Sequence, residues 1–222
     1  MTLDPKSLES QANRRLGGRH VLLFLVLCPV LVAVGVWLQR ESLTSANMMG
    51  LLAMFFGAAL LAVILAVAPL GRLAWQALGF RPAGWRPLIL GPLAALALSM
   101  AVSQLGIEPQ GMKQALEFGS DPTRLGVSLL VIALLAPVVE ELVFRGLLYG
   151  WLENRWGRGV AFVASSLAFA GAHWEPAHVI LVVPLGLLFG WLRLRTGSLW
   201  PSLVAHVVNN GLAVAAAGLL AR

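Results

Sequence analysis

Three charged side chains lie inside an apolar stretch that runs from Leu125 to Leu152: Glu140, Glu141 and Arg145. A charge near the centre of a bilayer costs roughly 2.5–3.5 kcal/mol on insertion scales, so such groups are rare and usually functional. Glu141 and Arg145 have the i, i+4 spacing, acid first, that favours an ion pair on one helix. Glu140 points about 100° away from that pair, because a helix has 3.6 residues per turn. We therefore expect Glu140 to be free for acid–base chemistry.

Two further apolar segments carry polar residues at a similar depth. Measured along each helix at 1.5 Å per residue from the end nearest the basic connections, the depths are roughly 18 Å for Glu140 and Asn210, 21 Å for His173 and 12 Å for His206. Polar groups isolated in lipid would lack partners, so these four should face one another across a wet cavity. His206 and Asn210, spaced i, i+4, share one helix face.

These residue types predict a reaction. Glu140 and His173 can activate a water molecule, and His206 and Asn210 carry N–H groups that can stabilise an oxyanion. The predicted chemistry is hydrolysis of an amide bond inside a membrane. The simpler interpretations are hydrogen bonds between helices for the His206 and Asn210 pair, and an ion pair for the charged cluster, which leaves one glutamate unexplained. Phe169, one turn before His173, is expected to pack and orient that histidine.

The order of these residues resembles a known family. The motifs E-E-x-x-x-R, F-x-x-x-H and H-x-x-x-N resemble those of the CPBP family of intramembrane proteases, which includes the type II CAAX prenyl endopeptidases and bacteriocin-immunity-like proteins. The resemblance covers roughly residues 87–220, and the chain fills every motif position. It implies a glutamate-centred protease in which the first glutamate and the middle histidine act on water. The motif residues are Glu140, Glu141, Arg145, Phe169, His173, His206 and Asn210.

No cofactor is predicted, but the resemblance keeps a metal-dependent variant open. A set of two histidines and one glutamate is a known catalytic zinc ligand set, and here it would be Glu140, His173 and His206. An H-E-x-x-H zinc motif is absent from the sequence. An aspartyl protease needs two aspartates in the membrane, whereas Asp4 and Asp121 lie outside the apolar segments.

Composition defines the fold class. The chain has 222 residues, of which 59% are hydrophobic and only 12% charged, against about 25% charged in soluble domains. We predict an all-α polytopic membrane helix bundle of about seven transmembrane helices, with a tail at 1–20 and one membrane domain at 21–222 whose catalytic helices lie in about 125–220. The predicted segments are 21–38, 46–70, 87–107, 125–152, 159–173, 176–194 and 198–220.

Basic residues predict the orientation. Eleven lie in the N-terminal tail and in the connections on its side, and four lie on the other side. Because cytoplasmic loops are rich in Lys and Arg, this places the N-terminus in the cytoplasm. The short chain and its composition indicate a bacterial inner membrane. The net charge of +6 therefore reflects topology and not nucleic-acid binding.

The expected partners are the bilayer and a membrane-anchored protein substrate. Cleavage near the C-terminus of a membrane-embedded or lipid-anchored protein is the leading hypothesis, with substrate identity and oligomeric state left open. The alternatives are a non-catalytic immunity or chaperone protein of the same fold, and a proton-coupled transporter, since Glu, His and Arg also build proton relays.

Overall fold

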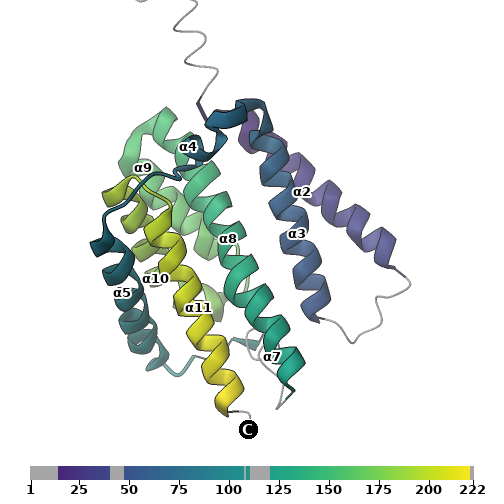
Figure 1. Ribbon diagram of the computed structural model, residues 1–222, viewed down its shortest axis with the longest axis vertical. Helices are drawn as coiled ribbons and strands as arrows, with labels where there is room; N and C mark the ends of the chain where they lie inside the picture. Colours follow the sequence, from purple (N-terminus) through teal and green to yellow (C-terminus); the bar gives the residue numbers. More distant parts are fainter. Residues whose placement is uncertain (1–14, 41–47, 108, 111–120, 221–222) are drawn as a thin grey trace, which may run out of the picture.

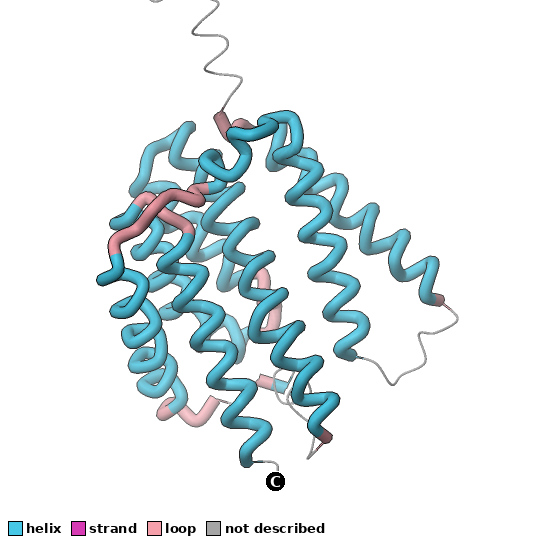
Figure 2. Tube along the Cα trace, viewed as in Figure 1, coloured by secondary structure: helices cyan, strands magenta, loops and turns pink. Residues whose placement is uncertain are grey.

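The computed structural model describes residues 15–40, 48–107, 109–110 and 121–220, and every regular element within them is a helix (Figures 1 and 2). The all-α prediction is confirmed. Residues 1–14 of the predicted tail lie outside the described residues, as do Lys113 and Arg222 of the charge count. Outside residues 122–171 the helical elements are α2 (Gly18–Gln39), the continuous run of α3 (Met48–Val67), η1 (Ala68–Leu73) and α4 (Ala74–Leu78), then α5 (Trp85–Ser103), α10 (Pro176–Thr196) and α11 (Trp200–Leu220).

The remaining elements follow one another without a break from residue 122 to residue 171. They are α7 (Pro122–Ser128), η2 (Leu129–Leu135), α8 (Ala136–Glu140), η3 (Glu141–Leu148) and α9 (Tyr149–Gly171). The elements η2 and η3 are π-helical turns on either side of α8. Glu140 is thus the last residue of a short α-helix between two π-helical turns, a distortion that is frequent at functional sites.

Among the described residues, six helices are long and apolar enough to cross a membrane, and one of them covers the predicted segment 125–152 and nearly all of 159–173. Pro122–Gly171 has 50 residues and would extend about 75 Å as a straight helix, against about 30 Å of hydrocarbon. Gly157 breaks it with φ 85° and ψ 172°, a conformation that glycine adopts most easily. Beyond this turn the chain folds back, since the rings of Phe144 and Phe169 lie 5.5 Å apart. These two arms correspond to the predicted segments 125–152 and 159–173.

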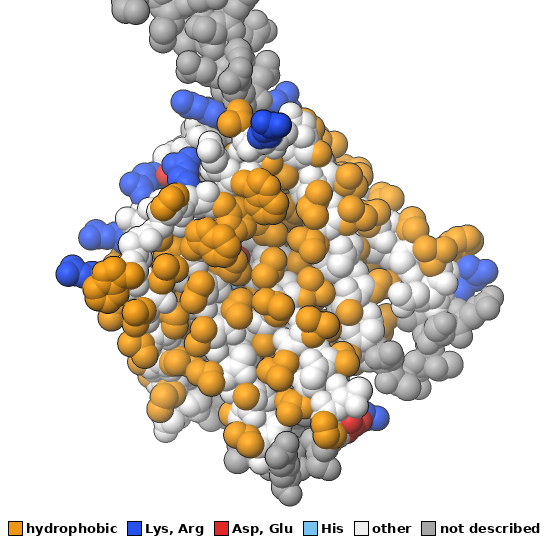
Figure 3. All heavy atoms as spheres, in the orientation of Figure 1, with side chains coloured by type: hydrophobic (Ala, Val, Ile, Leu, Met, Phe, Trp, Pro, Cys, Tyr) orange, Lys and Arg blue, Asp and Glu red, His pale blue; other side chains and the backbone are white. Residues whose placement is uncertain are grey.

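Large apolar side chains cover the outside of the bundle, as Figure 3 shows for one face. Only 6% of the most apolar 18-residue stretch of α2 is buried by the rest of the protein. Leu22 on this helix is 63% exposed and Trp37 is 61% exposed. Surfaces of this kind suit lipid, which solvates apolar side chains.

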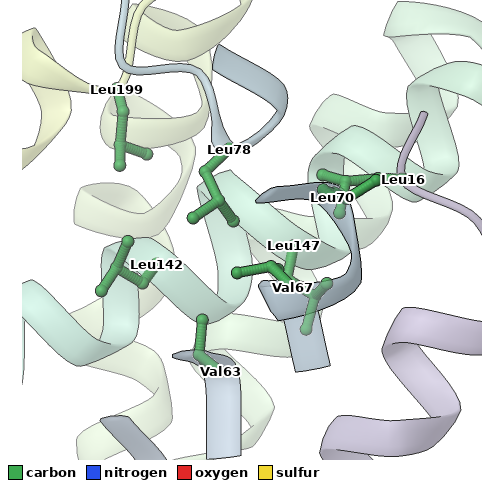
Figure 4. Close-up of a cluster of buried hydrophobic side chains, with 8 residues drawn as sticks. All are labelled: Leu16, Val63, Val67, Leu70, Leu78, Leu142, Leu147 and Leu199. Atoms are coloured by element: carbon green, nitrogen blue, oxygen red, sulfur yellow. The ribbon is translucent and has the colours of Figure 1, made fainter. Parts of the chain in front are cut away.

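A cluster of buried aliphatic residues joins α3 and α4 to the helix that carries the charges (Figure 4). Leu142 and Leu147 from η3 pack in this cluster with Val63 and Val67 from α3. Close packing between helices is a main source of stability where lipid replaces water. The cluster holds η3 in place, and with it the charged residues. Its members are Leu16, Val63, Val67, Leu70, Leu78, Leu142, Leu147 and Leu199.

The basic connections meet at one end of the bundle. The Asn154 side chain donates to the carbonyl of Leu16 at 3.0 Å, the Ser198 hydroxyl donates to the carbonyl of Arg81 at 2.7 Å, and Leu199 N–H donates to the carbonyl of Gly79 at 2.8 Å. These bonds join residue 16 to residue 154, and residues 79 and 81 to residues 198 and 199. The connections therefore pair as the predicted topology requires. Which side of the membrane this end occupies remains a prediction.

Candidate active site

Glu141 and Arg145 form a buried ion pair. Both side chains are fully buried, and Arg145 Nη1 lies 3.2 Å from Glu141 Oε1. Arg145 Nη2 donates to the carbonyl of Gly186 on α10 at 2.9 Å. Glycine at position 186 lets α10 lie close to Phe169, because a Cβ there would lie 2.9 Å from the Phe169 ring. Arg145 is also 4.1 Å from the Phe169 ring centroid, a favourable cation–π geometry.

His206 lies between the two glutamates. Its Nδ1 is 3.2 Å from Glu141 Oε1, and its Nε2 is 3.5 Å from Glu140 Oε2. Its ring stacks on Phe189 with a centroid separation of 4.7 Å and an interplanar angle of 23°. The prediction treated Glu140 as free and His206 as an open N–H donor. In the structure both ring nitrogens of His206 face carboxylate oxygens instead, so the two groups interact directly.

Glu140 is the more accessible of the two carboxylates. Its side chain is 19% exposed, whereas that of Glu141 is fully buried. Arg145, Glu141, His206 and Glu140 therefore form a continuous polar chain that begins in the closed interior and ends at an accessible carboxylate. Only the last member of this chain is placed to meet a substrate or a water molecule.

His173 faces the same phenyl ring as His206. The Phe169 ring centroid lies 5.2 Å from that of His173 and 5.6 Å from that of His206. His173 Nδ1 lies 3.0 Å from the Phe169 carbonyl, and because a carbonyl only accepts, Nδ1 must carry the proton. The Nε2 atom of His173 is then the nitrogen with a lone pair, as the proposed role in binding water requires. His178, which the predicted site did not include, packs against His173 at 4.5 Å between centroids.

Asn210 makes a structural contact at the same helix interface. Its Nδ2 donates to the carbonyl of Ile132 at 3.2 Å. In this π-helical turn Ala136 N–H donates to Val131 O, five positions back. The next carbonyl, that of Ile132, would need the N–H of Pro137, which proline lacks. Asn210 supplies the missing donor through one of its two amide N–H groups, which agrees with the simpler interpretation of Asn210 as a hydrogen-bond donor between helices. The second N–H of the amide is left for an oxyanion.

If Asn210 replaces the N–H that Pro137 lacks, substitutions at these two positions should be coupled. Asn210→Ala should lower the free energy of unfolding by about 1 kcal/mol, because the Ile132 carbonyl loses its donor. In a Pro137→Ala background the same change should cost less, because residue 137 then supplies an N–H. Reversible unfolding of the four proteins in mixed detergent micelles measures the coupling, and equal effects in both backgrounds would contradict it.

The predicted alternative is a metal held by Glu140, His173 and His206, and it stays a prediction. Among the described residues, no group of three His, Cys, Asp or Glu side chains is placed to hold a metal ion. Both nitrogens of His206 are directed at the glutamates, so a metal between these residues would require the ring to turn.

Comparison with known proteins finds a matching family and relatives that are named as membrane peptidases. Residues 122–212 match the family described as type II CAAX prenyl endopeptidase Rce1-like. The putative membrane peptidase YdiL of Bacillus subtilis is 29% identical over 86 residues, 39% of this chain and 35% of that protein. The membrane-embedded CAAX protease MroQ of Staphylococcus aureus is 29% identical over 97 residues, 41% of this chain and 39% of that protein.

A third relative is the UPF0177 protein in abiGi 5'region of Lactococcus lactis, 30% identical over 87 residues, 39% of this chain and 36% of that protein. The matched part thus spans less than two fifths of each relative's length, and no solved structure matches. The family match runs from α7 into α11 and contains every residue of the three motifs. This match and the names of these relatives confirm the predicted resemblance of residues 122–212 to the CPBP family, which includes CAAX protease-like membrane peptidases.

Proposed function

We propose that this protein is an intramembrane endopeptidase that cleaves a membrane-embedded or lipid-anchored protein near its C-terminus. The observation that carries the proposal is the accessible carboxylate of Glu140, 3.5 Å from His206 Nε2, at the end of a polar chain that is otherwise buried. A structural ion pair needs only Glu141 and Arg145. Glu140 has no such structural need, and an accessible carboxylate next to a histidine is what general-base catalysis requires. The names of the relatives support the same class of reaction.

In the proposed mechanism Glu140 accepts a proton from a water molecule, which His173 Nε2 also holds by a hydrogen bond. The water oxygen forms a bond to the carbonyl carbon of the substrate, and the carbonyl oxygen becomes an oxyanion. Protonated Glu140 attracts the His206 N–H less strongly, so this N–H donates to the oxyanion together with the second N–H of Asn210. Collapse of the intermediate breaks the C–N bond, and Glu140 returns its proton to the leaving amine.

The test is a comparison of membrane proteins in cells that lack the chain, cells that express it, and cells that express Glu140→Gln. Shortened C-termini should occur only with the unmodified protein. Glu153→Gln is the matched control, because Glu153 pairs with Arg158 at 3.3 Å in α9 and not with the site residues. Identical shortened C-termini with Glu140→Gln would refute the proposal. A biological effect that persists without cleavage would favour the immunity or chaperone alternative.

Chelators should leave cleavage unchanged. The proposed water is activated by Glu140 and His173 without a metal, since the donor set does not converge. Purified protein treated with EDTA and with phenanthroline, then assayed on a substrate from the proteome comparison, gives the measurement. Loss of activity that zinc restores, while magnesium does not, would instead support the ligand set of Glu140, His173 and His206.

The proposed orientation follows from the basic residues, with the N-terminus in the cytoplasm of a bacterial cell. The loop at 174–176 would then face outward, next to His173. Exported proteins with a C-terminal membrane anchor are therefore the substrates that we favour. Reporter fusions after residue 174 test the orientation, and a cytoplasmic signal would move the proposed substrates to the inner leaflet.

A further inference from the structure

A cavity of about 400 Å³ lies at the basic end of the bundle, among side chains that the proposed reaction does not use. Figure 3 shows arginine side chains gathered at this end, around α4 and α9. The cavity is lined by residues that precede α2 and by parts of α4, α9 and α10. Its volume falls in the range of small-molecule sites. Its polar lining residues are Arg15, Gln76, Arg81, Glu153, Asn154 and Arg193.

The charge of this cavity is unbalanced. Three arginines line it and only one acid does, and that acid, Glu153, already pairs with Arg158 at 3.3 Å. Over the ranges that the structure describes, neither the Arg15 nor the Arg81 guanidinium has an ion pair or hydrogen bond. An excess of positive charge around a concave surface favours an anionic ligand.

Arg193 shows that the cavity is a built site and not a chance gathering of surface arginines. Arg193 is 4% exposed, whereas a basic side chain at a membrane boundary normally extends into the headgroup region. Its Nε donates to the carbonyl of Arg145 at 3.0 Å, and it packs over the ring of Tyr149 at 4.9 Å. In the described part of the chain its two terminal nitrogens make no hydrogen bond. A buried guanidinium with two unused nitrogens at a cavity wall is suited to a bidentate anion.

We propose that this cavity binds a phosphate group, either the headgroup of an anionic phospholipid or free phosphate. Guanidinium groups match the planar, two-oxygen edge of a phosphate. Basic pockets between membrane helices are a known form of lipid headgroup site. The amides of Gln76 and Asn154 line the same cavity and can bind the glycerol or ester oxygens of a lipid. Arg193 would then connect the phosphate to the proposed active site, because its Nε donates to the carbonyl of Arg145.

The probe is a mixture of equal amounts of phosphatidylglycerol and phosphatidylcholine, added to the full chain purified in neutral detergent. Native mass spectrometry should show that the protein retains phosphatidylglycerol. Arg15→Gln combined with Arg81→Gln should weaken this binding about thirtyfold, the effect of two basic side chains near an anionic surface. Arg72→Gln combined with Arg86→Gln is the matched control, because both arginines are exposed and lie outside the cavity lining.

A second measurement separates the two sources of phosphate. Thermal unfolding is followed in inorganic phosphate and in chloride at equal ionic strength. Retention of phosphatidylglycerol without an effect of phosphate assigns the site to a lipid headgroup, and a higher midpoint in phosphate shows that the free ion binds as well. If the double variant fails to fold, Arg81→Gln with Arg86→Gln as its control makes the same comparison.

The proposal is overturned if the unmodified protein retains both lipids equally and phosphate has no effect. It is also overturned if the cavity variants and the control variants lose binding to the same extent. Neither result depends on proteolysis, so the outcome is separate from that of the proposed function.

Discussion

Glu140→Gln should lower the rate of substrate cleavage by about 10²–10⁴-fold, the usual contribution of a general base. Glutamine has nearly the same shape and can still accept a hydrogen bond from His206, but its amide cannot take a proton from water. The side chain is 19% exposed, and His206 keeps Glu141 as a partner, so the substitution leaves no buried charge without a partner. Single-turnover cleavage of a substrate from the proteome comparison measures the rate, and circular dichroism should show unchanged helix content.

Two controls make this prediction specific. Glu153→Gln removes a carboxylate of the same type from α9 and should leave the rate within a few-fold of the original, because its partner is Arg158. Glu140→Asp keeps the carboxylate but withdraws it by about one methylene, which should leave intermediate activity because catalysis depends on position. Activity of Glu140→Gln equal to that of Glu153→Gln would exclude Glu140 as the base.

The local relationships in this site were predictable from spacing. Glu141 and Arg145 are separated by one helical turn, and an i, i+4 pair of opposite charge contacts without any tertiary information. The membrane segments were also predictable from local sequence, because the bilayer imposes a length on each apolar run. The turn at Gly157 was harder to place, although the polar stretch between 152 and 159 separated the two predicted segments.

Contacts between helices were not predictable from spacing alone. That His206 lies between both glutamates depends on how α11 packs against α8 and η3, which involves rotation of each helix about its axis. The π-helical turns add to this difficulty, since each shifts the direction of every later side chain. Pro137 was a usable signal, because a proline inside an apolar helix leaves a carbonyl in need of a donor. Asn210 is that donor, a role that the oxyanion hypothesis alone does not account for.

Arg145→Met should destabilise the protein by about 3–5 kcal/mol, the range for breaking a buried ion pair by removing one partner. Methionine fills much of the same volume, but it leaves the carboxylate of Glu141 fully buried and without its cation. It also removes the hydrogen bond to Gly186 and the contact with Phe169. Unfolding in mixed detergent micelles gives the free energy. Arg124→Met is the control, because the exposed Asp121–Arg124 pair should contribute at most about 1 kcal/mol.

A second substitution separates charge from packing. If the loss comes from the unpaired carboxylate, Glu141→Leu added to Arg145→Met should recover a large part of the stability, because no buried charge then remains. If the double variant is as unstable as Arg145→Met, the packing of the guanidinium between Phe169 and α10 is the dominant contribution. Activity should not return in either case, because His206 loses its contact with Glu141 and its ring is no longer held for Glu140. Recovered stability without recovered cleavage would show that this buried pair serves the fold and the position of His206 at the same time.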